Sequence, residues 1–113
     1  RELVAEAGEM FSALENKYSD LVVMIVGDDE KELKETREHI QERNPEARLF
    51  SAQECKGLEF RHGLIIDLLN HSFLSSNPIT VNQYKLLSGL YVCLTRFRES
   101  VTVLTTVGSP LLP

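Results

Sequence analysis

Two short strings in this chain combine residue types that can bind and act on a phosphorylated ligand. The first string is KGLEF at residues 56–60. Its lysine can pair with a phosphate, its glycine lets the backbone approach a ligand closely, and its glutamate can accept a hydrogen bond from a hydroxyl group. The string therefore predicts ligand contacts at Lys56, Gly57 and Glu59. A plain turn between two strands, with solvated charges, is the alternative interpretation.

The second string is LYVCLTR at residues 90–96. Phosphoryl transfer spreads negative charge over the γ-phosphate oxygens, and a planar, permanently charged guanidinium stabilises that charge, which is worth about 10³ to 10⁵ in rate. Arg96 is therefore a candidate catalytic residue. Arg96 and Arg98 can instead be cations at the end of a helix, where they offset the helix dipole. For Arg98 we favour this structural role.

In this order and at this spacing, the two strings resemble motifs V and VI of UvrD/Rep-type superfamily 1 helicases. The resemblance implies that residues 1–113 are the second, C-terminal (2A-type) RecA-like motor domain of such a helicase, and hence a fragment of a longer protein. It also implies that Arg96 is the arginine finger and that Glu59 contacts the ribose. Lys56 and Gly57 would line the phosphate side of the nucleotide.

The resemblance also assigns contacts with nucleic acid. Ser51 and Gln53 fall where the family places a hydroxyl and a His that face a single strand, although Gln53 replaces the common His. Glu54 and Cys55 stand where the family often has small residues. Motif IV of the family carries a further arginine that reaches the γ-phosphate, but the matching position here is Gly27. This chain therefore departs from the family at one nucleotide contact and at part of the strand contact.

The sequence contains no GxxxxGK[ST] phosphate-binding loop and no acidic magnesium motif after a strand. The resemblance thus implies that ATP and Mg²⁺ are bound mainly by an N-terminal RecA-like domain of the same protein. We expect this chain alone to be inactive and the complete protein to be an ATP-dependent DNA helicase or translocase. Its expected partners are that domain and single-stranded DNA, with RNA as the alternative. Its expected location is the cytoplasm, or the nucleus in a eukaryote.

Composition limits the other classes of protein. A chain of 113 residues forms one compact domain. Its formal charge of -5 argues against a free-standing nucleic-acid module, because phosphates repel an acidic surface, so any strand contact must be local. No apolar run approaches the roughly 20 residues of a membrane span, and no membrane role is expected. The chain opens on Arg1 without a signal peptide pattern, which favours an excised piece.

Helical and extended patterns alternate along the chain. Apolar spacing predicts a helix over residues 2–17, and the unbroken apolar run at 21–26 predicts a strand that is buried on both faces. The further elements that we expect are a helix over 29–43, strands over 47–52 and 63–69, a loop over 70–82, a long helix, and a strand over 101–106. The long helix is marked by an apolar stripe of Leu87, Leu90, Tyr91, Leu94 and Phe97.

This alternation predicts an α/β fold of three layers with a mainly parallel sheet, which the resemblance specifies as RecA-like without its own P-loop. Ligands of such sheets gather at the carboxyl ends of the strands. The predicted strand at 47–52 ends just before KGLEF. We therefore expect that string at the carboxyl edge of the sheet.

The sequence offers no pattern for a metal site. Cys55 and Cys93 lack CxxC spacing and accompanying His pairs, so we expect two reduced, mostly buried thiols. His39, His62 and His71 have no metal-ligand spacing. Surface or packing roles are expected for all three.

Two other functions remain open. Residues 26–29 and the IID at 65–67 imitate a phosphoacceptor receiver domain, in which an acidic pair and a later Asp hold magnesium, with Thr95 as the switch residue. The late lysine of such domains is missing, because the last lysine is Lys85. The third interpretation is a degenerate RecA-like domain that is kept for protein contacts, which Gly27 and the acidic surface permit.

Overall fold

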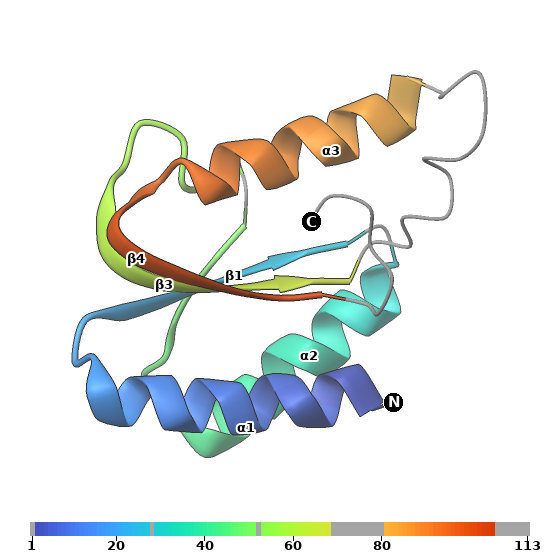
Figure 1. Cartoon of the computed structure of the whole chain (residues 1–113). Helices are drawn as coiled ribbons and strands as arrows, with labels where there is room; N and C mark the ends of the chain where they lie inside the picture. The colour runs from blue at the N-terminus through green and yellow to red at the C-terminus, as the bar shows by residue number, and fades with distance from the viewer. Residues whose placement is uncertain (1, 28, 52, 69–80, 106–113) are drawn as a thin grey trace.

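The fold is a parallel sheet with helices on both faces. The computed structural model describes residues 2–27, 29–51, 53–68 and 81–105. The elements in these residues are α1 (Glu2–Lys17), β1 (Leu21–Val26), α2 (Glu30–Arg43), β2 (Arg48–Phe50), β3 (Phe60–Asp67), α3 (Val81–Leu94) and β4 (Phe97–Leu104). The strands lie in the order β2-β1-β3-β4, and all three pairings are parallel. α1 and α2 cover one face and α3 the other (Figure 1). The predicted α/β class and parallel sheet are confirmed.

β1 is buried along its whole length because it lies between two strands and two helical layers. Successive side chains of a strand point to opposite faces. Val23 and Ile25 pack in the cluster beneath α1 and α2, whereas Val22 and Met24 pack in the cluster beneath α3. The unbroken apolar run is thus explained, since both faces of the strand are covered.

α2 owes its two ends to side-chain and backbone caps. The Asp29 carboxylate accepts hydrogen bonds from the backbone N–H groups of Lys31 (3.0 Å) and Glu32 (3.4 Å). These bonds satisfy donors that the first turn leaves free. The helix therefore begins one residue later than predicted. At the other end, the Asn44 N–H donates to the Ile40 carbonyl (3.1 Å) and Pro45 follows.

The predicted bounds of β2 and β3 are wrong. β2 has only three residues, and β3 begins at Phe60 rather than at residue 63. Phe60 belongs to the sheet because its N–H donates a hydrogen bond to the Arg96 carbonyl oxygen at 2.8 Å. Arg61, which broke the apolar pattern, lies exposed and pairs with Glu99 and Asp20.

The predicted end of the long helix is also wrong. α3 ends at Leu94, and Phe97 opens β4 four residues before the predicted strand. Arg98 is therefore an exposed residue of β4 and not a cation at a helix end. Phe97 leaves the helix because its ring covers Gly63 of the neighbouring strand.

The predicted apolar stripe of α3 is confirmed only in part. Leu90 is buried and Leu94 packs partly against the same cluster, but Tyr91 is 68% exposed. The Leu87 side chain lies outside the described part of the chain. α3 begins at Val81, inside the predicted loop over 70–82, and most of that loop lies outside the described residues.

The described residues of the connection from β2 to β3, residue 51 and residues 53–59, contain no helix. The connection must cross β1, because β2 and β3 lie on either side of that strand. Such parallel crossovers usually take a dozen or more residues with a helix. Here Cys55, which is 0% exposed, packs in the cluster beneath α3. The connection thus crosses on the same face, and in the same direction, as the β3-α3-β4 crossover, so the two share one hand.

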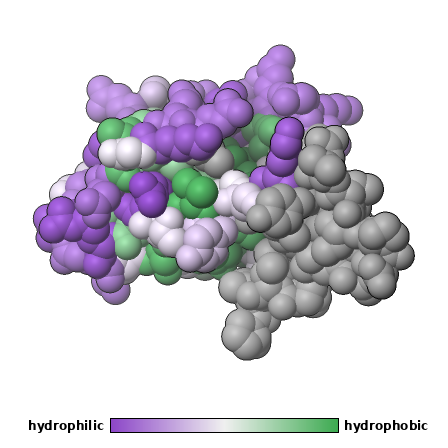
Figure 2. Space-filling view, turned by 90° about the horizontal axis from the view of Figure 1, so that it is seen from above, coloured by the Kyte–Doolittle hydropathy of each residue, from purple (hydrophilic) through white to green (hydrophobic). Residues whose placement is uncertain are grey.

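The face that carries α3 is covered less thickly than the opposite face. Among the described residues, one helix and the connection 51–59 pack on it, against two helices on the other side. Seen from this side, apolar surface remains visible between hydrophilic residues (Figure 2). Leu58 and Val101 are large apolar residues that stay 43% and 36% exposed.

Two histidines have packing roles, as predicted. His62 lies against the Tyr18 ring, with 3.9 Å between ring centroids, and its Nδ1 is 2.7 Å from the Ser100 hydroxyl. His39 lies so close to Gly8 that a methyl group there would overlap its ring. α1 and α2 therefore pack closely at this point. His71 lies outside the described residues.

Gly63 gives the first test of the packing. A Cβ at this position would overlap the Phe97 ring. We expect Gly63→Ala to lower the free energy of unfolding by about 1–3 kcal/mol, because the ring must leave its packed position. Urea unfolding measures this cost. In a Phe97→Ala background the added methyl group should cost less, and an equal cost in both backgrounds would contradict the packing explanation.

Candidate functional site

The two strings meet at the amino edge of β3 and β4. Glu59 directly precedes β3, and Arg96 directly precedes β4. The hydrogen bond from the Phe60 N–H to the Arg96 carbonyl oxygen joins them. Because the two strands are parallel, their amino ends share one edge. The structure thus brings the backbone of Glu59 and Arg96 together.

The prediction that KGLEF lies at the carboxyl edge is wrong for the end of the string. The connection 51–59 runs from the carboxyl end of β2 to the amino end of β3, so its residues move along the sheet. Ser51 follows Phe50, which pairs with the middle of β1. The Phe50 ring nevertheless lies near the Phe60 ring, with 5.1 Å between ring centroids. Gln53 is exposed in the turn that follows Ser51.

Gly57 closes the turn that presents this string. Its φ is 78°, in the left-handed region that favours glycine. A Cβ at this position would meet nothing within 4 Å, so the backbone conformation and not a lack of space calls for glycine. Lys56 and Glu59 are also exposed. The backbone of this turn is therefore open to a ligand.

The Arg96 guanidinium donates a hydrogen bond through Nη2, but its Nε has no acceptor among the described residues. Its Nη2 donates to the Thr95 hydroxyl (3.2 Å), which donates in turn to the Val92 carbonyl (2.9 Å). The Arg96 Nε is buried and has no hydrogen-bond partner among the described residues. An unpaired buried donor is costly, more so on a charged group. An anion that reached this nitrogen would remove the cost.

The role of Thr95 differs from the one predicted. Sequence reasoning treated it as a receiver switch residue, which belongs at the carboxyl edge of the sheet. Thr95 instead precedes β4 at the amino edge, and its hydroxyl positions Arg96. The switch prediction is therefore wrong. No sequence signal marked this positioning role, because a threonine between a helix and a strand has many uses.

Ser51 and Glu54 hold the start of the connection by reciprocal bonds. The Ser51 N–H donates to Glu54 Oε1 (2.8 Å), and the Glu54 N–H donates to Ser51 Oγ (3.2 Å). The bond from the Ser51 backbone, followed by the bond from its side chain, lowers the pKa of the Glu54 carboxyl. The Ser51 hydroxyl therefore accepts from the Glu54 backbone and also bonds to the Glu54 carboxylate, so a phosphate of a nucleic-acid strand would have to displace that second bond.

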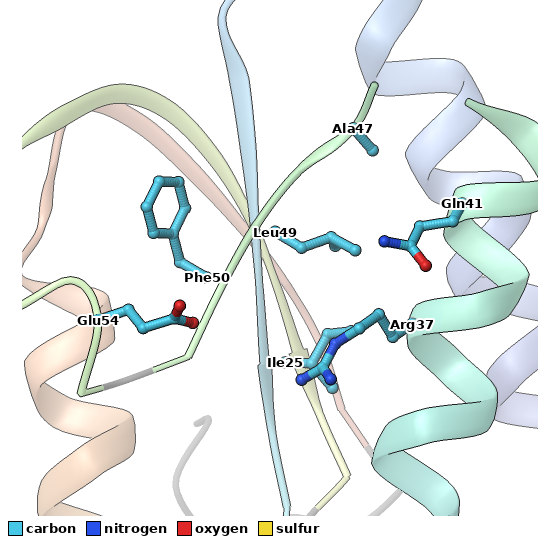
Figure 3. A pocket seen from close by; sticks show the side chains of 7 residues that line it. All are labelled: Ile25, Arg37, Gln41, Ala47, Leu49, Phe50 and Glu54. Carbon is cyan, nitrogen blue, oxygen red and sulfur yellow. The ribbon is translucent and has the colours of Figure 1, made fainter. Parts of the chain in front are cut away.

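A hollow of 310 Å³ lies beside β2. Its lining comes from β1, α2, β2 and the residues next to them: Ile25, Arg37, Gln41, Ala47, Leu49, Phe50 and Glu54. Arg37 and Gln41 lie on the α2 side of β2, and Glu54 lies on the other side (Figure 3). No residue predicted for ligand binding lines this hollow. No sequence pattern indicates this hollow, since polar residues on an exposed helix usually face water.

No described group of three or more His, Cys, Asp or Glu side chains could hold a metal ion. Cys55 and Cys93 are reduced, buried thiols, as predicted. Among the helices in the described ranges, none has the length and apolar character of a membrane span. Comparisons with protein-family profiles, with curated proteins and with solved structures find no match to the chain. The geometry of the site therefore carries the functional argument.

Gly57 provides a test of the turn. We expect Gly57→Ala to lower the free energy of unfolding by about 1–2 kcal/mol, because a side chain disfavours positive φ. Gly57→Asn is the matched variant, and it should cost less, since asparagine tolerates this conformation. Urea unfolding of both variants measures the difference. If alanine costs no more than asparagine, the turn does not hold this conformation in solution.

Glu54 provides a test by pH. Because its pKa is lowered below the ordinary 4.5 in the folded chain, it contributes stability that is present above 4.5. That stability is lost as the pH falls from 4.5 through the folded value. We expect Glu54→Gln to show a shallower loss of stability below pH 4.5, and Ser51→Ala to fall between the two. Urea midpoints measured against pH give the slopes. Equal slopes for Glu54→Gln and the natural chain would rule out the bond.

Proposed function

We propose that this chain is the C-terminal RecA-like motor domain of a UvrD/Rep-type helicase or translocase. Such a domain closes over ATP that is bound to an N-terminal RecA-like domain of the same protein. The observation that supports this most is the bond between the Phe60 N–H and the Arg96 carbonyl. It puts the KGLEF turn and Arg96 on one edge, which a nucleotide between two domains would need.

Arg96 is the proposed arginine finger. Its Nη2 is already positioned by Thr95, so little reorganisation is needed when charge develops on the γ-phosphate. The unpaired, buried Nε fits the same role, because it lacks an acceptor among the described residues. Glu59 would accept a bond from the ribose, and Lys56 and Gly57 would face the phosphates.

ATP and Mg²⁺ would be held mainly by the N-terminal domain, and Mg²⁺ would neutralise phosphate charge there. The residues of this chain supply only the outer contacts. That division agrees with the absence of a phosphate-binding loop from the sequence. It also agrees with the formal charge of -5, because one arginine can act locally within an acidic domain.

Single-stranded DNA, with RNA as the alternative, would contact the other end of the connection 51–59. Ser51 and Gln53 lie there, and Lys56, Gly57 and Glu59 lie towards the amino edge. One continuous segment thus runs from the proposed strand contact to the proposed nucleotide contact. A movement at one end of this segment would move its other end. ATP binding would shift the bound nucleic-acid strand in this way.

A second candidate function, the receiver-like phosphoacceptor, is favoured by a different observation. Asp67 is buried at the end of β3, and its carboxylate accepts a hydrogen bond from the Thr105 hydroxyl (2.8 Å) just after β4. The strand order is also that of the first four strands of flavodoxin-like sheets. Asp29, however, caps α2, and Asp28 lies outside the described residues. This function would place the ligand at the carboxyl edge, opposite Arg96.

Substitution of Arg96 tests the motor proposal in the complete protein. We expect Arg96→Ala to lower ATP turnover by about 10³ to 10⁵, because the γ-phosphate loses its guanidinium. Arg96→Lys should also be slow, since lysine lacks the planar fork. The matched control is Arg98→Ala, an exposed change in β4 that should leave turnover near its natural rate.

The assay is steady-state ATP turnover with saturating single-stranded DNA. A normal rate for Arg96→Ala would contradict the arginine-finger role. A complete protein that turns over no ATP at all would favour the degenerate domain that is kept for protein contacts.

A further inference from the structure

We propose that Cys55 and Cys93 are a modification site, at which a small-molecule disulfide oxidant joins the connection 51–59 to α3 by a reversible disulfide bond. Both cysteines are reduced thiols, and both are 0% exposed in the same cluster. They come from segments that are far apart in sequence. The inference concerns this chain alone and does not depend on the proposed motor function.

The two thiols lie in one buried cluster and are near enough to affect one another. Cys55 projects from the connection 51–59, and Cys93 projects from the last turn of α3. Their side chains form a hydrogen bond with one another. Sulfur atoms at hydrogen-bond separation need only a small movement to reach a covalent bond, provided that the Cβ atoms are close. The surrounding side chains of the cluster are apolar and include Leu90 and Ile65.

The order of reaction follows from burial and charge. Burial, with a smaller effect of the neighbouring Cys55, raises the pKa of the Cys93 thiol to about 12, so this thiol stays protonated near neutral pH. A protonated, buried thiol is a poor nucleophile. Cys93 is therefore a poor nucleophile while it stays buried, and the first attack falls to the cysteine that becomes accessible first.

The connection can open more easily than the helix. Its turn is held by isolated backbone bonds, from Cys55 N–H to the Ser51 carbonyl (3.3 Å), from Lys56 N–H to the Gln53 carbonyl (3.4 Å) and from Leu58 N–H to the Cys55 carbonyl (3.0 Å). Cys93 lies in the last turn of α3, which has a helical bond pattern behind it. Segments with few and weak backbone bonds open locally at lower free energy than helices in the core. Cys55 is thus the first of the two thiols to meet an oxidant.

The chemistry is thiol–disulfide exchange, with oxidised glutathione as the oxidant. The Cys55 thiolate attacks one glutathione sulfur, the glutathione S–S bond breaks, and one glutathione thiolate leaves. Cys93 then loses its proton to water, and its sulfur attacks the Cys55 sulfur of the mixed disulfide. The second glutathione thiolate leaves. The chain gives up two electrons and two protons, which convert one glutathione disulfide into two thiols.

The bond would fix the two turns of the amino edge to one another. Cys55 directly precedes Lys56, and Cys93 accepts the Arg96 N–H on its carbonyl oxygen (3.2 Å). A covalent link between the cysteines therefore restrains the segment that carries Gly57. Opening of the connection 51–59, which the reduced chain permits, would be suppressed.

The test compares the folded chain with the chain unfolded in urea. Each is equilibrated with mixtures of oxidised and reduced glutathione, quenched with acid, alkylated, and analysed by intact mass and peptide mapping. We expect an internal Cys55–Cys93 bond in the folded chain, with an oxidation constant at least about tenfold above that of the unfolded chain, because the native contact holds the thiols together.

Three results would overturn the proposal: equal constants, stable glutathione adducts or dimers in place of the internal bond, or thiols that stay reduced when the unfolded chain is oxidised. Hydrogen exchange on the natural sequence gives a second readout, which needs no buried substitution. The backbone amides of residues 53–58 should exchange at least about tenfold more slowly after oxidation. Unchanged exchange in the cross-linked chain would contradict the restraint of the connection.

Discussion

The structure depends on how the chain passes from β2 to β3. The two strands are parallel and lie on either side of β1, so the connection must cross the sheet and also return from its carboxyl end to its amino end. The part of this connection that the structure describes has no helix, and the buried Cys55 packs it beneath α3. The last residues of KGLEF therefore lie at the amino edge of β3 and β4, where Arg96 also lies.

The amino edge of β3 and β4 carries both the turn with Gly57 and the Arg96 guanidinium. Gly57 leaves the backbone of the turn open, and the Thr95 hydroxyl positions Arg96 while its Nε stays without an acceptor among the described residues. A buried donor without a partner is costly, and we propose that an anion bound between two domains would pair with it. The same short connection links this edge to Ser51, so the proposed strand contact is mechanically joined to the proposed nucleotide contact.

Much of the fold could be predicted from the sequence where a single local rule applied. The apolar run of β1 and the periodicity of α1 identified both elements, and Asp29 moved the start of α2 by only one residue. Tertiary contacts set the remaining bounds. The helical spacing of α3 continues to Phe97, but that ring packs over Gly63 and belongs to a strand. Strand order also depends on pairings that no local pattern records.

The residues of the candidate site were named from the sequence and stay a prediction, but the edge of the sheet predicted for KGLEF was wrong for the end of that string. The carboxyl-edge rule assumes that a ligand-binding string directly follows a strand. Here β2 ends early and β3 begins early, so Glu59 precedes a strand. No sequence pattern indicated the hollow lined by Arg37 and Glu54, because charged residues such as these usually lie on a solvated surface.

The most direct test of the account is hydrogen exchange of the complete protein with and without a non-hydrolysable ATP analogue. The account predicts that nucleotide slows exchange at residues 56–59 and at residues 95–96, and leaves residues 67–68 unchanged. Slowed exchange confined to the carboxyl edge, or no change at either turn of the amino edge, would contradict it.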